Sequence, residues 1–109
     1  MGRILTTSTE NIAGFEVIQI LGLVRGNTVR TRHIGRDIMA SFKTLVGGEI
    51  EGYTDLMSQA REEALNRMLE EAERRGADAV IGIRFETSNI METAAELLVY
   101  GTAVKLSPK

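Results

Sequence analysis

The sequence contains no cysteine and no tryptophan, and it has a single proline and a single histidine. Without cysteine the chain can form no disulfide, no thiolate metal site and no cysteine nucleophile. Soft heavy metals prefer thiolate ligands, so a thiolate-bound soft metal is excluded. The one imidazole, His33, has no recognisable nucleophile motif near it, which argues against a Ser/His/Asp site. The sequence therefore predicts no catalytic residues.

The chain also lacks the long apolar runs that membranes require. Residues 1–11 contain no apolar run of signal-peptide length. The longest apolar run falls far below the roughly 18 residues of a membrane span. The net charge of −2 argues against a general nucleic-acid binder. These absences predict a cytoplasmic protein that binds neither a membrane nor nucleic acid.

What is present suits one small domain. A length of 109 residues with 43% hydrophobic content predicts a single domain over residues 1–109. Charge is unevenly spread: six basic and three acidic residues give +3 in 1–48, whereas five basic and eleven acidic residues give −6 in 49–92. Two interpretations stay open, namely opposite charges that set the register of a head-to-tail ring, or a solvated acidic face on a helix.

The period of the apolar residues predicts the order of the elements. Residues 3–8, 15–24, 77–87 and 94–106 have strand character, whereas residues 34–46 and 53–75 repeat at helical spacing. We expect a turn at 25–27 and a loop at 88–93. With short connections, the order β, β, α, α, β, β predicts an α+β two-layer fold in which helices cover one face of a small antiparallel sheet.

The second helix has the clearest pattern. Its apolar stripe consists of Tyr53, Leu56, Met57, Ala60, Ala64, Leu65, Met68 and Ala72. On the opposite side, Glu63–Arg67, Glu70–Arg74 and Glu71–Arg75 are spaced as i,i+4 ion pairs. Gly76 is placed to end the helix. The methionine and alanine of the stripe are ordinary core residues.

Two of the predicted strands are apolar on both faces. In 15–24 and 94–106, alternate residues on either side are mostly apolar, although the helices cover only one face of the sheet. A sheet with one wet face should alternate apolar and polar residues. We therefore expect the second face to meet another subunit in a homo-oligomer.

The stretch LVGGEIEGYTDLMSQARE, residues 45–62, has two interpretations. In the structural one, Gly47 and Gly48 break the chain between the helices and Thr54 or Asp55 caps the second helix. In the functional one, the glycines and the helix N-terminus admit an anionic or polar ligand if Arg61 and Arg84 converge. The candidate ligand-binding residues are Gly47, Gly48, Glu49, Tyr53, Arg61 and Arg84. The candidate ligands for a hard divalent metal ion are Glu49, Glu51, Asp55 and His33.

A neighbouring pair of charges is also predicted. Arg84 and Glu96 fall on adjacent strands, and we expect them to form a structural salt bridge rather than a catalytic pair.

The chain resembles the YbjQ-like family of small bacterial and archaeal proteins, which carry a heavy-metal-binding label. The resemblance rests on LTTST at 5–9, GLVRGNTV at 22–29, VGGEIEGYTDL at 46–56, AREEALNRML at 60–69, RGADAVIGIRF at 75–85 and YGTAVKL at 100–106. These segments span nearly the whole chain in order. The resemblance implies a small antiparallel sheet with a helical layer, assembled as a homopentameric ring.

The function expected from these observations is that of a ring-forming protein of the cytoplasm, which is not an enzyme and binds a small ligand or an ion, or simply assembles. The alternative is a hydrolase-like enzyme with a site at subunit boundaries. Flavin storage, as in the similarly sized dodecins, would require an aromatic residue to stack on the ring system, and no tryptophan is present.

Overall fold

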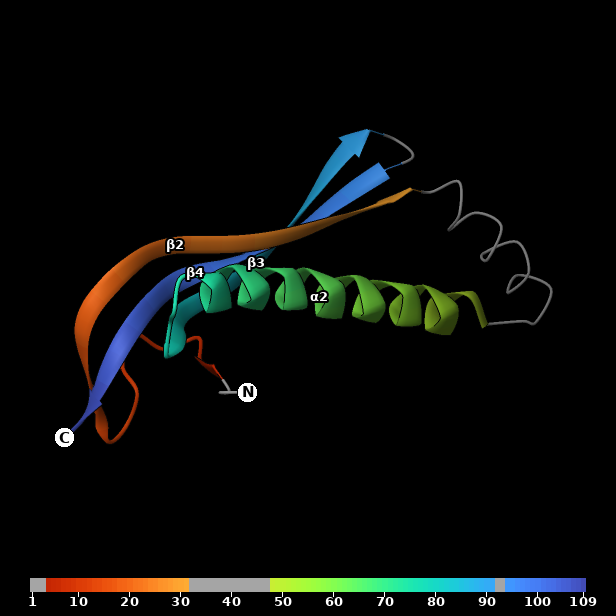
Figure 1. Ribbon diagram of the computed structural model, residues 1–109. Helices are drawn as coiled ribbons and strands as arrows, with labels where there is room; N and C mark the ends of the chain where they lie inside the picture. Colours follow the sequence, from red (N-terminus) through yellow and green to blue (C-terminus); the bar gives the residue numbers. More distant parts are fainter. Residues whose placement is uncertain (1–3, 32–47, 92–93) are drawn as a thin grey trace.

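The computed structural model describes residues 4–31, 48–91 and 94–109. Its elements are β1 (Leu5–Thr6), β2 (Phe15–Thr31), α2 (Gly48–Arg74), β3 (Ala79–Met91) and β4 (Ala94–Pro108). The strands form one layer, and α2 lies along one face of it (Figure 1). The fold is therefore α+β, as predicted. The helix expected at 34–46 lies outside the described residues.

The sheet is mixed, not purely antiparallel as the sequence suggested. Its strand order is β1-β3-β4-β2, with β2–β4 and β3–β4 antiparallel and β1–β3 parallel. Strands joined by a hairpin must run antiparallel, but a long crossover permits parallel pairing. Because β2 and α2 separate β1 from β3 in the chain, the short β1 is free to run parallel to β3.

The predicted turn at 25–27 is wrong, since β2 continues through it. Arg25, Gly26 and Asn27 pair in register with Tyr100, Val99 and Leu98 of β4. Gly26 serves a close approach instead of a turn. A Cβ atom there would collide with the Ala64 carbonyl oxygen and lie 2.5 Å from the Met68 nitrogen, both on α2.

The predicted loop at 88–93 is also shorter than expected. β3 runs to Met91, and Ser88 and Asn89 pair with Glu96 and Ala95 of β4. The last strand, predicted as 94–106, is confirmed and extends to Pro108. β3 and β4 therefore form a long hairpin, which extends past the part of the sheet that α2 covers (Figure 1).

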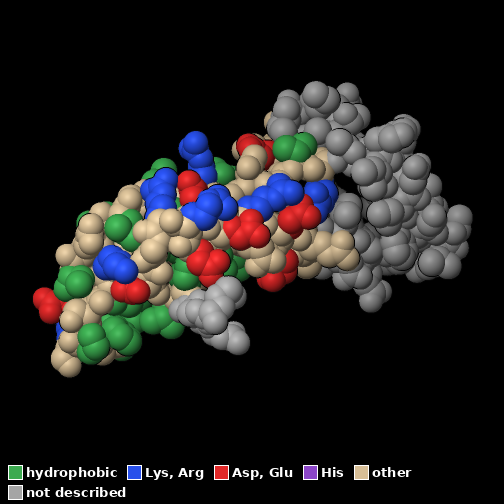
Figure 2. Space-filling view, in the orientation of Figure 1, with side chains coloured by type: hydrophobic (Ala, Val, Ile, Leu, Met, Phe, Trp, Pro, Cys, Tyr) green, Lys and Arg blue, Asp and Glu red, His purple; other side chains and the backbone are tan. Residues whose placement is uncertain are grey.

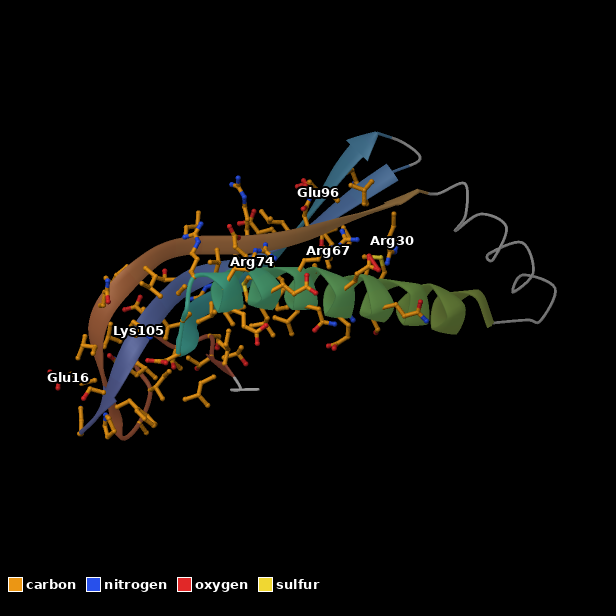
Figure 3. All side chains as sticks on the ribbon, viewed as in Figure 1. Glu16, Arg30, Arg67, Arg74, Glu96 and Lys105 are labelled. Atoms are coloured by element: carbon orange, nitrogen blue, oxygen red, sulfur yellow. The ribbon has the colours of Figure 1, made fainter. Side chains whose placement is uncertain are left out.

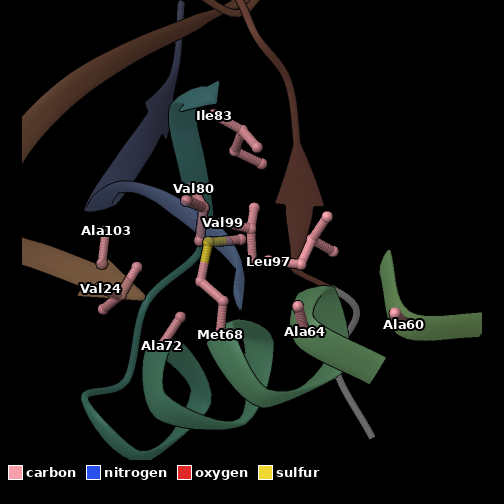
Figure 4. Close-up of a cluster of buried hydrophobic side chains, with 10 residues drawn as sticks. All are labelled: Val24, Ala60, Ala64, Met68, Ala72, Val80, Ile83, Leu97, Val99 and Ala103. Atoms are coloured by element: carbon pink, nitrogen blue, oxygen red, sulfur yellow. The ribbon is translucent and has the colours of Figure 1, made fainter. Parts of the chain in front are cut away.

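The core lies between α2 and the middle of the sheet. Ala60, Ala64, Met68 and Ala72 are fully buried, which confirms the central part of the predicted helical stripe. They pack against Val24, Val80, Ile83, Leu97, Val99 and Ala103 (Figure 4). Three of the four helix residues are alanine, so the helix backbone can approach the sheet closely.

The end of α2 follows the prediction at Gly76. That residue has a φ of +76°, which glycine adopts without steric cost. The Ala77 N–H bonds the Ala72 carbonyl at 3.1 Å, and the Gly76 N–H bonds the Glu73 carbonyl at 3.0 Å. This pair of bonds is a Schellman motif, which satisfies carbonyls at the helix end.

The molecule is long for its size. Its radius of gyration is 17.3 Å and its extents are 56 × 24 × 24 Å. A compact domain of this length would have a radius of gyration of roughly 13 Å. Figure 1 shows β2 and β4 curving together away from α2 toward the C-terminus. The helix therefore leaves part of the sheet uncovered.

Candidate functional site

The uncovered part of the sheet exposes apolar side chains of β2. The exposed fractions are 36% for Val17, 62% for Ile18, 69% for Ile20 and 56% for Leu23. We call these four residues the β2 patch. The register of β2 against β4 shifts between Val17 and Gln19 and again between Ile20 and Gly22. Such bulges bend a strand, and here they occur where β2 curves away from α2.

Hydrophobic and charged side chains gather over different parts of the molecule. In Figure 2, hydrophobic side chains cluster at the end of the molecule where β4 finishes. Lysine, arginine and carboxylate side chains gather over the middle of the molecule. Large exposed apolar patches on soluble proteins commonly mark interaction sites. The sequence predicts that strand 15–24 has more apolar residues than the helices can cover. The exposed side chains of the β2 patch agree with that prediction.

The face of the sheet away from α2 carries a polar group beside the patch. Arg25, Tyr100 and Arg84 pair in one row across β2, β4 and β3, and Gly26 in the next row points at α2. Because alternate residues point to opposite faces, the row with Tyr100 faces away from the helix. Tyr100 donates a hydrogen bond to Glu86 at 3.3 Å.

The predicted Arg84–Glu96 salt bridge is wrong. Glu96 pairs with Ser88 across the hairpin, whereas Arg84 lies four positions further along β3 from the Ser88 row, opposite Tyr100. Arg84 donates instead to the carbonyl oxygen of Ser8 at 2.9 Å. Glu96 accepts a hydrogen bond from the Asn27 side chain at 3.0 Å.

Side chains of α2 reach the outer edge of β2. Arg67 Nη1 donates to the Asn27 carbonyl at 2.6 Å, and Arg75 Nη1 donates to the Leu21 carbonyl at 3.3 Å. Between them, Glu71 Oε1 accepts the Arg25 N–H at 3.1 Å. Since β2 is the last strand of the sheet, these are backbone groups that no neighbouring strand uses.

Ion pairs connect the same helix residues to one another. Of the three predicted pairs, Glu63–Arg67 and Glu71–Arg75 are confirmed, each at 3.1 Å. The predicted Glu70–Arg74 pair is wrong, since these two described side chains form no ion pair. Arg30 of β2 also contacts Glu63 at 3.4 Å, and Arg30 and Arg67 lie between α2 and β2 in Figure 3. The helix and the strand are therefore joined by charge on the side that faces solvent.

The contacts between α2 and β2 change the pKa of the Glu71 carboxyl group. The Arg25 N–H holds the pKa of Glu71 below its usual value of 4.5, and Arg75 and Arg74 lower it further. Partial burial acts in the opposite direction on that pKa. A hydrogen bond to the charged form and nearby opposite charge both favour ionisation, so Glu71 stays charged into mildly acidic solution.

The candidate residues of the stretch 45–62 lie mostly in α2. The helix begins at Gly48, so Thr54 and Asp55 are inside it and the predicted cap there is wrong. Two positions of an extended strand would point the same way, but successive helix positions turn by about 100°, so the backbone positions of Glu49 and Glu51 lie on different sides of α2. The structure describes only the backbone of Glu49, Glu51, Tyr53 and Asp55, while Gly47 and His33 lie outside the described residues.

Arg61 and Arg84 are not brought together. Arg61 lies on α2, is exposed, and donates to the Ser58 hydroxyl at 3.1 Å. Arg84 lies on the face of the sheet away from α2 and bonds Ser8. Within one chain, a ligand therefore cannot bridge the two guanidinium groups from a single side.

The donor set does not fit a soft heavy metal. The chain has no thiolate, and the residues that the structure describes contain no group of three His, Asp or Glu side chains able to hold a metal ion. An oxygen-bound divalent ion involving residues 49–55 stays a prediction. Likewise, no helix in the described ranges is long and apolar enough to span a membrane.

Sequence reasoning found the apolar strand but missed its polar edge. The contacts from α2 to β2 join side chains to backbone groups, and backbone groups have no sequence signature. One signal was available, since Arg67, Glu71 and Arg75 recur every four residues on one side of the helix. The same spacing also suits pairing within the helix, which is what the sequence predicts.

Within the described ranges, fold and surface together define a class of small α+β protein with a four-stranded mixed sheet, a helix that covers one face and an exposed apolar edge strand. A family model described as "Putative heavy-metal-binding", YbjQ, matches residues 4–107. The chain belongs to this YbjQ family, which confirms the resemblance found in its sequence motifs.

Relatives agree with this assignment, and a solved structure shares the fold. A UPF0145 protein from Thermotoga maritima is 59% identical over 102 residues, which cover 94% of this chain and 96% of the relative. A UPF0145 protein from Thermosipho africanus is 56% identical over 102 residues, which cover 94% of each chain. A UPF0145 protein from Shewanella frigidimarina is 55% identical over the same length. The fold is also similar to the crystal structure of a DUF74-family protein of unknown function from Pediococcus pentosaceus, with a TM-score of 0.64, 17% identity, and coverage of 95% and 98% of the two chains.

Proposed function

We propose that this protein is a self-assembling binding protein of the cytoplasm, not an enzyme, whose copies meet through the β2 patch and hold a small ligand or an ion. The observation that carries the proposal is the exposure of Ile18, Ile20 and Leu23, each more than half exposed on one strand. The long shape adds support, because an elongated chain of this size buries less of its apolar surface than a compact one.

The strength of such a contact can be estimated. Full burial of one Ile or Leu side chain contributes about 1.5–3 kcal/mol. With somewhat more than half of each side chain still exposed, burial in an interface would contribute on the order of 1–2 kcal/mol each. Three such side chains supply on the order of 4 kcal/mol before the cost of association, and a closed ring uses the contact once per subunit.

The homopentameric ring implied by the family resemblance is the closed arrangement we propose. A ring repeats each residue around one axis, so a site at subunit boundaries can be built from one or two residues per copy. The candidates for that site are those of the helix start, Gly48, Glu49 and Tyr53, with Arg61 further along α2. The absence of thiolates favours an oxygen-bound divalent ion or a polar ligand over a soft metal.

The test is the mass of gently purified protein by native mass spectrometry and light scattering. We expect wild-type protein at a multiple of the 12.0 kDa subunit, with any retained ion or metabolite visible as added mass. The double variant Ile18→Asp, Ile20→Asp should run as a folded single subunit. Phe85→Asn is the matched control, because Phe85 is 46% exposed but lies on β3, and it should keep the wild-type mass.

Two results would contradict the proposal. Wild-type protein that stays a folded single subunit at micromolar concentration would remove self-association altogether. An unchanged assembly in the Ile18, Ile20 variant would remove the β2 patch as the contact. A turnover signal in a broad substrate screen, abolished by replacing Glu49, Tyr53, Arg61 or Arg84, would favour the hydrolase-like alternative instead.

A further inference from the structure

The outer edge of β2 is where a second strand could add to the sheet. Edge strands present unpaired N–H and C=O groups, which can pair with another chain. Along β2, three of these groups are held by α2: the Leu21 carbonyl by Arg75, the Arg25 N–H by Glu71 and the Asn27 carbonyl by Arg67. We call Arg67, Glu71 and Arg75 the edge guard.

The spacing of the guard matches the spacing of the strand. Four residues of a helix rise about 6 Å, and two residues of a strand rise about 6.7 Å. Arg67 and Glu71 differ by four residues and contact Asn27 and Arg25, which differ by two. Helix and strand run in opposite directions here, so these two turns of α2 meet successive outward-facing groups of β2. One turn further on, Arg75 contacts Leu21, four residues before Arg25 and beside the register shift between Ile20 and Gly22.

Close packing at Gly26 makes this reach possible. The glycine lies between Arg25 and Asn27 and brings the α2 backbone against β2. The guard residues are themselves held by the Glu63–Arg67 and Glu71–Arg75 ion pairs. Hydrogen bonds with an ionised partner are roughly twice as strong as neutral ones, so the guard is a set of strong contacts on the edge.

We infer that the edge guard closes residues 21–27 of β2 to a second copy of the same strand. A strand adding there needs the Leu21, Arg25 and Asn27 backbone groups and would have to displace all three guard side chains. The apolar residues Ile18 and Ile20 lie before this range, and none of the three guard hydrogen bonds involves them. Copies are thereby directed to contact through side chains of the β2 patch, and open-ended strand pairing is suppressed.

This inference deepens the proposed self-association by naming the route that is blocked, but its test does not depend on the assembly itself. The variant Arg67→Met, Glu71→Leu, Arg75→Met removes the guard. The control Glu70→Leu, Arg74→Met removes a carboxylate and a guanidinium at adjacent positions of the same helix, both exposed and without a hydrogen bond to β2 in the described structure. The probe is a labelled peptide with the sequence of residues 19–27.

We expect the guardless variant to bind the peptide, measured by fluorescence anisotropy, and to become thioflavin-T positive on standing. Wild type and the control should do neither. Hydrogen exchange reports whether the edge has opened, since the Arg25 amide loses its acceptor and should exchange about tenfold faster. Faster exchange without peptide binding or thioflavin-T signal would overturn the inference.

A second pair of variants covers the case in which the triple variant does not fold. Glu71→Leu removes the acceptor for the Arg25 N–H, whereas the amide oxygen of Glu71→Gln can still accept it. If Glu71→Leu binds the peptide and Glu71→Gln does not, the result supports the guard. If both variants bind the peptide no better than wild type, the inference is overturned. If wild-type protein proves to be a single subunit, the proposed assembly fails while the guard result stands.

Discussion

Replacing Gly26 by alanine should cost far more than a methyl group on a strand usually does. The new Cβ would collide with the Ala64 carbonyl oxygen and lie 2.5 Å from the Met68 nitrogen. Ordinary contact for such an atom begins at 3.4 Å, so α2 must move by at least 0.9 Å, the difference between 3.4 and 2.5 Å. Both opposing atoms belong to the helix backbone, so no side chain can rotate away. Overpacking of this kind costs about 1–3 kcal/mol, and the upper end applies here.

The displaced helix would also weaken its bonds to the strand on either side. The Arg67–Asn27 and Glu71–Arg25 hydrogen bonds flank the contact, and together they add about 1 kcal/mol to the loss. In the opposite direction, alanine restricts the unfolded chain, which raises the free energy of unfolding by about 0.4–1 kcal/mol. We expect a net loss of about 3 kcal/mol in the free energy of unfolding, which is a large part of a typical domain stability.

Urea unfolding followed by circular dichroism, at one fixed protein concentration, measures this loss. Arg25→Ala is the control, because the change keeps the backbone N–H and trims a side chain that is exposed on the other face. It should change stability by less than about 0.5 kcal/mol. If Gly26→Ala and Arg25→Ala have the same free energy of unfolding, the close approach of α2 to β2 at Gly26 is contradicted.

Two further changes address the core and the titrating carboxylate. Met68→Ala should lower the free energy of unfolding by about 2–5 kcal/mol, since Met68 is fully buried at the centre of the core, and urea unfolding measures it. Glu71→Gln tests the pH dependence: because the folded pKa of Glu71 lies below 4.5, its charge stabilises the fold above that pH and the contribution is lost as pH falls below it. The stability difference between wild type and Glu71→Gln should therefore shrink in acid, and a pH-independent difference would contradict the assigned cause.

The helix could be predicted because its determinants are local. Ala60, Ala64, Met68 and Ala72 repeat at helical spacing, and that repeat alone identifies the buried face. The Schellman end at Gly76 follows from a glycine after a basic last turn. None of these features depends on which strand the helix meets.

The errors occurred where one residue type serves two purposes. Glycine between Arg25 and Asn27 reads as a turn in sequence, but a glycine within a strand also marks a place where another backbone comes close. Only the position of α2 decides between the two. Similarly, Arg84 bonds Ser8 because the chain after β1 lies beside β3, and that long-range pairing cannot be predicted from the residues around Arg84.

The candidate site divides along the same line. The apolar residues on both faces of strand 15–24 predict exposed side chains such as Ile18 and Ile20, because the side chains themselves show which positions are apolar. The edge guard was not predicted, because Leu21, Arg25 and Asn27 take part through backbone atoms that every residue carries. The start of α2 at Gly48 was missed because Glu49, Glu51 and Tyr53 alternate like a strand while having backbone positions in a helix.

The same packing that stabilises the single chain also leaves part of its apolar surface uncovered. Alanines on α2 and Gly26 on β2 bring helix and sheet together closely, but small residues bury little apolar area each. The straight helix follows β2 only as far as the bulges, where the strand curves away with Ile18 and Ile20 exposed. The uncovered apolar surface thus follows from the helix contact itself, and a second copy can bury it without opening the guarded edge.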